Sequence, residues 1–256
     1  MLFTDIHCHI VPSIDDGAEC IDTTNDMLDI AREDGIENII ATPHFIYGEI
    51  NNTMQHINDS AESAIKLAAD KGIQLYCGSE LFICPQLCSL VDEGVAATLN
   101  NSRYVLVEFP MMSIPEYTKD ILFSLQLQGY VPIIAHPERN RIIQDKPNIL
   151  LSFVERGILT QINATSINRI YGSKVQKVAF ELIGQGLAHF VASDAHTTRN
   201  RAPRLSKAYD EICKKFDQDV ADNLFCYNGK AVIYNREIAA EITKHTKKKT
   251  IFSYFF

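Results

Sequence analysis

An apolar stretch with two histidines stands at the start of the chain and reads Phe3-Thr4-Asp5-Ile6-His7-Cys8-His9-Ile10-Val11-Pro12. Its composition predicts a β-strand, in which alternate side chains share a face, so Asp5, His7 and His9 point the same way. Two imidazoles two residues apart on one face can bind one metal ion. An affinity tag would be a run of histidines, whereas this is one His-x-His pair inside a strand, which favours a metal site.

Length and composition narrow the class of protein. The chain has 256 residues, 46% hydrophobic and 22% charged, with a formal net charge of −8. This length fits one α/β barrel domain, and the negative charge argues against a nucleic-acid backbone as the partner. We expect no signal peptide, because the first residues lack a basic and then an apolar segment, and no apolar run is long enough to span a membrane. Seven cysteines without a C-x-x-C pair indicate free thiols in a reducing cytoplasm.

Predicted helices and apolar strands alternate along the chain. Strands are expected in the opening stretch and at 37–44, 73–81, 104–108, 131–136, 158–164 and 189–194. Helices are expected at about 22–34, 54–71, 85–95, 115–129, 147–157, 173–185, 204–216 and 218–227. Five of the helical patterns end at a glycine that leads directly into a strand, namely Gly35, Gly72, Gly129, Gly157 and Gly186. Seven apolar strands separated by helices indicate a parallel sheet covered on both faces, and fit a (β/α) barrel better than an open sheet.

Six of these strands end in a side chain that can bind a metal ion, namely His9, His44, Glu80, Glu108, His136 and Asp194. Asp16 and His196 follow in loops just beyond two of the strands. Because ligands of α/β proteins bind at the carboxyl ends of the strands, we expect these side chains to lie together. One such residue alone is more often structural, but this many acidic groups at one edge require cations. Imidazoles and carboxylates without a thiolate suit manganese, iron or zinc.

Several motifs in combination resemble the PHP (polymerase and histidinol phosphatase) metallophosphoesterases. They are His7-x-His9, Asp15-Asp16-Gly17, Thr42-Pro43-His44, Gly78-x-Glu80, Glu108, His136-Pro137-Glu138-Arg139 and Ser193-Asp194-Ala195-His196. The Asp-Asp-Gly turn after the His-x-His pair and the His-Pro-Glu-Arg motif are most similar to the bacterial CpsB/CapC/YwqE-type protein-tyrosine phosphatases. The resemblance implies one phosphatase domain over residues 1–235, folded as a distorted (β/α)7 PHP-type barrel of parallel strands surrounded by helices. Residues 236–256 are then expected to form a C-terminal helix and a basic and aromatic tail.

The resemblance also implies three divalent metal ions, commonly manganese, with iron and zinc as alternatives. The implied ligands are, for the first metal, His7, His9, Glu80 and Asp194; for the second, Glu80, Glu108 and His136; and for the third, Asp16, His44 and His196. Spacing alone leaves Asp15 and Asp16 open, and alignment to the Asp-Asp-Gly turn favours Asp16. Phe45 stands where many relatives have a second histidine, and we expect no ligand to be lost by this difference.

Two arginines follow predicted ligands in the loops, and the resemblance implies that both bind the phosphoryl group. Arg139 lies three residues after His136, and Arg201 lies in the loop after His196. A guanidinium offers a planar pair of donors that matches a phosphate. The alternative is a solvated loop arginine, which we expect for Arg141 and Arg199.

The function predicted in this way is that of a metal-dependent protein-tyrosine phosphatase, which hydrolyses phosphotyrosine by a metal-bound hydroxide. The thiol mechanism is excluded, because none of the seven cysteines has an arginine six residues later. The expected substrate is a membrane-associated bacterial tyrosine autokinase of capsule or exopolysaccharide biosynthesis. One alternative is a PHP-type small-molecule phosphoesterase such as a histidinol-phosphate phosphatase. Another is a non-catalytic metal-binding regulatory module, which the complete ligand set disfavours.

The expected location is the cytoplasm, with the chain end as a candidate contact to the inner membrane face. Residues 244–256 combine Lys247, Lys248 and Lys249 with four aromatic side chains. Basic and aromatic residues together favour an anionic membrane surface. A frayed terminus explains the same composition equally well.

Overall fold

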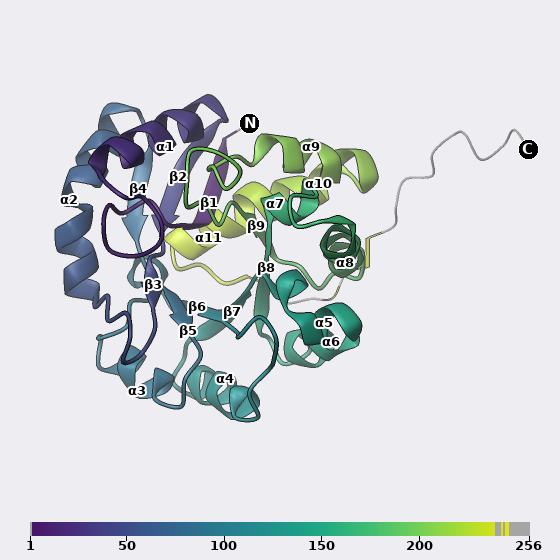
Figure 1. Ribbon diagram of the computed structural model, residues 1–256. Helices are drawn as coiled ribbons and strands as arrows, with labels where there is room; N and C mark the ends of the chain where they lie inside the picture. The colour runs from purple at the N-terminus through teal and green to yellow at the C-terminus, as the bar shows by residue number, and fades with distance from the viewer. Residues whose placement is uncertain (1, 239–241, 243, 246–256) are drawn as a thin grey trace, which may run out of the picture.

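The strands of the computed structural model form a ring of parallel strands inside a layer of helices (Figure 1). The structure describes residues 2–238, 242, 244 and 245. The strands are β1 Phe3–Cys8, β2 Ile36–Ala41, β3 His44–Phe45, β4 Gln74–Cys77, β5 Glu80–Phe82, β6 Tyr104–Glu108, β7 Val131–Ala135, β8 Leu159–Asn163 and β9 Phe190–Ala192. They pair in the orders β1-β2-β4 and β3-β5-β6-β7-β8-β9. The predicted α/β class with parallel strands surrounded by helices is confirmed.

Two of the predicted strands are each broken into two short ones. The strand expected at 37–44 is β2 followed by β3, and the strand expected at 73–81 is β4 followed by β5. Pro43 lies in the first break, where it has no N–H group to give to a strand ladder. Pairing continues across both breaks, because Gly78 N donates to Ala41 O at 2.8 Å and Glu80 N donates to Pro43 O at 3.1 Å. The ring therefore consists of seven strand segments, as the sequence predicts.

The first and last strands close the ring. His9 N donates to Ala195 O at 2.8 Å, and Asp194 N donates to His7 O at 2.9 Å. Cys8 and Ala195 form a parallel bridge between the end of β1 and the residues after β9. Closure, which the strand pattern alone could not prove, thus takes place at the His-x-His stretch.

The helices cover the outside of the ring. The longer ones are α1 Ile21–Glu33, α2 Met54–Asp70, α4 Thr118–Leu127, α8 Ser173–Gly184 and α9 Ser206–Lys215. The shorter ones are α3 Leu87–Asp92, α5 Arg141–Asp145, α6 Asn148–Val154, α7 Ala164–Ile167, α10 Gln218–Asp222 and α11 Asn228–Ile233, with η1 Leu99–Asn101, η2 Pro137–Arg139 and the π-helix η3 Asn223–Tyr227. Sequence periodicity missed α5, α7 and α11, which are too short to show it. The helix α1 begins at Ile21, one residue before the predicted start.

Apolar side chains fill one end of the barrel and leave the other end to polar groups. The interior core contains Ile6, Ile40, Leu106, Ile133 and Leu159, each 0–1% exposed. Val232 and Ile233 of α11 join this cluster and cover that end. Since these residues precede the strand ends in the sequence, the polar side chains that follow lie at the carboxyl edge.

The C-terminal part of the chain is described only in pieces. Residues 236–238, 242, 244 and 245 are not helical. The lysines at 247–249 and the aromatic residues of the predicted tail lie outside the described residues. In the part of the chain that the structure describes, no helix is long and apolar enough to cross a bilayer.

Candidate metal centre

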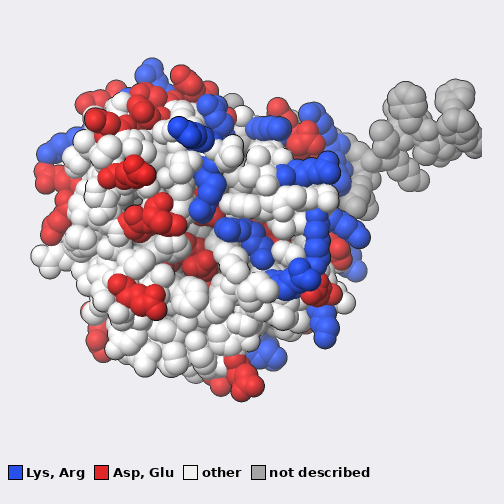
Figure 2. Space-filling view, in the orientation of Figure 1, with Lys and Arg blue, Asp and Glu red and all other residues white. Residues whose placement is uncertain are grey.

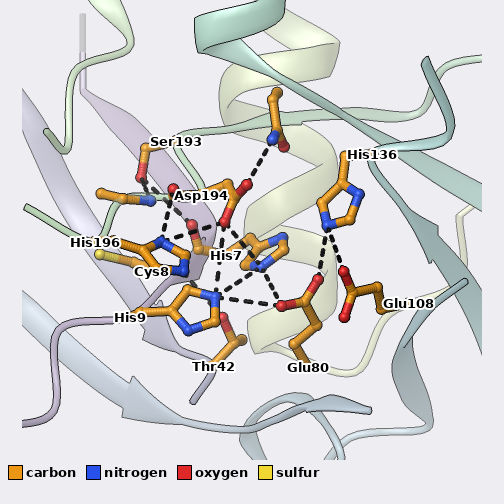
Figure 3. A network of polar contacts seen from close by, with 12 residues as sticks. His7, Cys8, His9, Thr42, Glu80, Glu108, His136, Ser193, Asp194 and His196 are labelled. Carbon is orange, nitrogen blue, oxygen red and sulfur yellow. Dashed lines mark hydrogen bonds and ion pairs between the residues drawn. The ribbon is translucent and has the colours of Figure 1, made fainter. Parts of the chain in front are cut away.

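The side chains predicted to bind metal come together at the carboxyl edge of the barrel. Figure 3 shows His7 from β1 and His9, directly after β1, beside Glu80 from β5, with Asp194 from the residues after β9 directed at the same point. His136 lies on the other side of Glu80, next to Glu108 (Figure 3). The edge is therefore built from strands that are far apart in the sequence.

The backbone is left-handed at two of the predicted ligands. His136 has a φ of 31° and Asp194 a φ of 50°, immediately after β7 and shortly after β9. A side chain other than glycine in this region costs on the order of 1–3 kcal/mol and is concentrated at functional sites. At both positions the turn directs the side chain into the polar edge instead of along the strand.

All nine predicted ligands fall into four groups of three or four metal-competent atoms within 4.8 Å of one another. The groups are His9, Asp16, His44 and His196; His7, His9 and Asp194; His7, Glu80 and His136; and His44, Glu80 and Glu108. Several residues belong to two groups, so neighbouring ions would share ligands. The pattern differs in part from the one implied by resemblance, since His9 also joins the third set and His7 lies beside His136.

The centre of this site is chemically suited to a cation. His7 Nε2 and His9 Nε2 are 3.2 Å apart, and Glu80 Oε2 lies 3.3 Å from both. His44 Nδ1 lies 3.1 Å from the same carboxylate oxygen. Among the described residues, Glu80 Oε2 and His44 Nδ1 are buried without a hydrogen-bond partner. Buried polar atoms are normally satisfied, and a metal ion would satisfy these.

Burial and crowding shift the ionisation of several of these groups. Burial raises the pKa of Glu108 to about 7, and the negative charge of Glu80 adds to the effect. Burial alone would lower the pKa of His9, but hydrogen bonds with Asp15 and Glu80 raise it to about 10. Burial is likewise outweighed at His136, where Glu80 raises the pKa to about 9. Strong coupling of this kind is typical of functional sites.

The structure assigns different places to the two adjacent aspartates. Asp16 Oδ1 lies 3.2 Å from His196 Nε2 and 3.5 Å from His44 Nε2, which puts Asp16 in the metal-competent group. The hydrogen bond with His196 holds the pKa of Asp16 well below its usual range. Asp15 Oδ2 instead lies 2.7 Å from His9 Nδ1 and accepts from His44 N at 3.0 Å. Sequence reasoning missed this orienting role of Asp15, for which the only signal was its place beside Asp16.

The buried carboxylate of Asp5, on β1, supports the site through Ser193. It shares the face of His7 on β1, yet it belongs to none of the four metal-competent groups. Its carboxylate accepts from Ser193 N at 3.0 Å and from Ser193 Oγ at 2.5 Å. Burial raises the pKa of Asp5 to about 6, against these hydrogen bonds. Asp5 thus connects β1 to the residue before Asp194.

Both predicted phosphoryl-binding arginines reach the site. Arg139 Nη1 donates to Asp194 Oδ2 at 3.0 Å, and Arg201 Nη2 donates to Asp194 Oδ1 at 2.9 Å. The Arg139 guanidinium also lies 4.4 Å from the centre of the Tyr171 ring, which fixes its plane. Arg201 Nη2 is 3.1 Å from His196 Nε2. Two guanidinium groups therefore converge on one carboxylate at the edge of the metal-competent cluster.

Arg141, at the start of α5, and Arg199 both have exposed side chains. Arg141 Nε pairs with Asp145 Oδ2 at 3.3 Å with an exposed side chain. Arg199 is exposed and lines a hollow of about 560 Å³ together with Asp16 and His196.

An α/β barrel with imidazoles and carboxylates gathered at its carboxyl edge defines the class of metal-dependent barrel hydrolases. The chain belongs to the CpsB/CapC family of capsular polysaccharide synthesis, whose family model matches residues 3–234. It is 34% identical to CapC of Staphylococcus aureus over 97% of this chain and 98% of that protein. It is 33% identical to the tyrosine-protein phosphatase YwqE of Bacillus subtilis, over 98% and 99% of the two chains. The resemblance seen in the motifs is thereby confirmed.

A solved structure agrees with this assignment. It comes from work on YwqE of Bacillus subtilis and CpsB of Streptococcus pneumoniae, described as metal-dependent tyrosine phosphatases, and superposes with a TM-score of 0.89 at 33% identity. The match covers 96% of this chain and all of the other.

Proposed function

We propose that this chain is a metal-dependent protein-tyrosine phosphatase, a hydrolase of phosphoric monoesters. The observation that carries the proposal is the convergence of nine imidazole and carboxylate side chains with two arginines at one edge of the barrel. Membership of the CpsB/CapC family and the named activity of YwqE support it.

We infer that the nine residues hold three divalent ions, with manganese first and iron or zinc as alternatives. The ligands are His7, His9, Asp16, His44, Glu80, Glu108, His136, Asp194 and His196. Mixed nitrogen and oxygen ligands without a thiolate suit these metals. Such ions, when bound, lower the pKa of water towards about 7 and so supply a nucleophile at neutral pH.

The arginines would bind the phosphoryl group of the substrate. Arg139 and Arg201 direct their Nη atoms at opposite oxygens of Asp194, so both reach the same small region. A phosphoryl group placed there would accept hydrogen bonds from both guanidinium groups, and these neutralise the charge that develops on its oxygens. The Tyr171 ring keeps the Arg139 plane in position for this. A phenolate leaving group requires little protonation, so an aryl phosphate fits a site without an assigned general acid.

The surface around the site is compatible with a phosphoprotein. Lys and Arg side chains gather on the half of the visible face formed by α5 to α9, and Asp and Glu on the half formed by α1 to α3 (Figure 2). The basic half lies on the side of the two arginines. An anionic segment around a phosphotyrosine would be attracted to this half despite the net charge of −8.

The substrate that we propose is a membrane-associated tyrosine autokinase of capsule or exopolysaccharide biosynthesis. The family's role in capsular polysaccharide synthesis supports the pathway. The proposal places the enzyme in the cytoplasm, peripheral at the inner membrane face.

A substrate panel with added manganese tests the activity. We expect a phosphotyrosine peptide and para-nitrophenyl phosphate to be hydrolysed, and histidinol phosphate to be turned over far less. Much faster turnover of histidinol phosphate would replace the proposal by the small-molecule alternative. Full activity in the His7→Ala or His136→Ala variant would refute the metal mechanism, and no activity with any substrate would favour a regulatory module.

A further inference from the structure

The strand β8 is the one predicted strand whose end offers no metal ligand, and its last two inward side chains are amides. Gln161 and Asn163 lie two residues apart on β8 and therefore share a face. Both are completely buried, as are His7 and Asp194. Buried amides are rare unless fully hydrogen-bonded, so their partners are informative.

The two amides join two predicted ligands in an unbroken chain of hydrogen bonds. Gln161 Oε1 lies 2.9 Å from His7 Nδ1. Gln161 Nε2 donates to Asn163 Oδ1 at 2.8 Å, and Asn163 Nδ2 donates to Asp194 Oδ2 at 2.6 Å. His7 lies on β1 and Asp194 after β9, so the amides of β8 reach two ligands of one metal-competent group.

The hydrogen bonds of this chain can have only one donor-to-acceptor direction. A carboxylate such as Asp194 only accepts, so Asn163 must present its amide nitrogen to it and its oxygen to Gln161. Gln161 must then present its nitrogen to Asn163 and its oxygen to His7, which therefore donates from Nδ1. In a neutral imidazole the lone pair is then on Nε2, the atom that lies 3.2 Å from His9 Nε2 and 3.3 Å from Glu80 Oε2.

A third buried group, the carboxylate of Glu138, holds the backbone of Asn163 in this hydrogen-bond chain. Glu138 Oε1 accepts from Asn163 N at 3.0 Å and from Ser166 Oγ at 2.6 Å. Glu138 is completely buried and lies in η2, between His136 and Arg139. Glu138 thus fixes the backbone of Asn163, while turning its side-chain amide would break the hydrogen bonds with Gln161 and Asp194.

We propose that Gln161 and Asn163 are positioning residues that set the ring tautomer of His7 and the orientation of Asp194, and so prepare both for one metal ion. Partners that orient metal ligands in this way typically change metal affinity about 10- to 100-fold. The inference rests on the proposed metal site, and it assigns a role to the strand that lacks a ligand.

The manganese affinity of the full-length protein tests the role of this hydrogen-bond chain. Gln161→Met and Asn163→Leu each remove one amide at nearly constant volume. We expect each to weaken the tightest manganese binding, measured by competition with a chelator, by about 10- to 100-fold. Because both variants break the same chain, the double variant is expected to bind about as weakly as either single one. Unchanged affinities, or a double variant that loses the product of the two effects, would overturn the inference.

A control on the same strand separates positioning from general stability. Thr160 is next to Gln161 but faces the other way, and its Oγ1 donates to Leu187 O. We expect Thr160→Val to lower the melting temperature without changing manganese affinity. An equal loss of affinity in this control would attribute the effect to the strand as a whole.

A second measurement reads the wild-type protein and uses a variant only to assign the signal. Nitrogen NMR of labelled histidine in the metal-free wild-type protein reads the His7 tautomer, with His7→Ala identifying the signal. We expect a proton on Nδ1, and a proton on Nε2 alone would refute the chain. If the wild type binds neither manganese nor iron or zinc, the proposed function fails, whereas the tautomer still decides the inference about Gln161.

Discussion

At the scale of single residues, Arg139 provides a direct test of phosphoryl binding. Its Nη1 contacts Asp194 and its plane rests on Tyr171, so it is held at the site by two side chains. We expect Arg139→Ala to lower kcat/KM for a phosphotyrosine peptide by about 100- to 1,000-fold, the usual loss for one group that stabilises developing charge. Manganese content should stay at the wild-type level.

The matched control for Arg139 is Arg141, two residues later. Its side chain is exposed and pairs with Asp145 at 3.3 Å. Arg141→Ala should leave kcat/KM within about two-fold, since exposed ion pairs contribute little. Equal losses in the two variants would indicate an effect of net charge instead of a specific contact.

His189 predicts a pH dependence of stability that has its origin outside the metal site. Burial lowers the pKa of His189 to about 4, and its Nδ1 accepts from Thr160 N at 3.1 Å. Because the folded pKa lies below the unfolded value of about 6.5, the unfolded chain binds the proton first. The stabilisation is complete above about pH 6.5 and is lost as the pH falls towards 4, by roughly 3 kcal/mol.

Urea unfolding of the wild type and His189→Gln at pH 7.5 and pH 5 would measure this contribution. We expect the wild type to lose more free energy of unfolding than the variant between the two pH values. An identical loss in both proteins would show that other groups cause the acid sensitivity.

The positions of candidate ligands could be predicted from the sequence, because most of them stand at or just beyond the end of an apolar strand. The orienting groups could not be predicted in this way. Asp15, Gln161 and Asn163 are ordinary polar residues until the fold brings His9, His7 and Asp194 next to them. Hydrogen-bond partners that are distant in sequence leave no periodic pattern.

At the scale of one structural element, the turn that carries Asp15 and Asp16 depends on Gly17. A Cβ atom on Gly17 would lie 2.2 Å from His9 O and 2.5 Å from His9 Cβ, so the turn packs directly on a predicted ligand. We expect Gly17→Ala to displace the turn and to weaken manganese binding at least ten-fold. Chelator competition would measure the change.

Gly48 provides the control for this substitution. It has a φ of 82°, and a Cβ atom there would meet nothing within 4 Å. Gly48→Ala should cost stability through its backbone, on the order of 1 kcal/mol, and leave manganese affinity unchanged. Weak manganese binding in both variants would mean that Gly17→Ala loses affinity only because it lowers stability.

Elements were predicted well where a pattern of several turns or an ending glycine marks them. The helix before β2, α1, ends at Glu33 and is followed by Gly35, whose φ of 88° is readily adopted only by glycine. The breaks at Thr42-Pro43 and Gly78-Ser79 were missed, because each stretch also contains the apolar residues expected of one continuous strand. Whether a strand is straight or broken depends on its neighbours, and the sequence of one strand does not contain that information.

At the scale of the whole molecule, metal binding and folding are expected to be coupled. The predicted ligands come from strands around the ring and from both sides of its closure at Cys8 and Ala195. Without cations, Glu80, Glu108 and Asp194 are buried close to one another, and like charges at such distances repel. Ions bound between them would remove the repulsion and add a connection between the end of β1 and the residues after β9, which the backbone joins at the bridge.

This coupling predicts a large effect of manganese on thermal unfolding. A ligand at 100 times its Kd that binds only the folded state adds about 2.7 kcal/mol, which corresponds to roughly 5–10 °C for a chain of this length. We expect the melting temperature of chelator-treated protein to rise by this amount on addition of manganese. Glu80→Gln, which changes a residue shared by two of the metal-competent groups, should lose most of the rise, whereas His189→Gln should keep it. A rise of the same size in Glu80→Gln would mean that the ions stabilise the protein from another place, and that the barrel edge is held together without them.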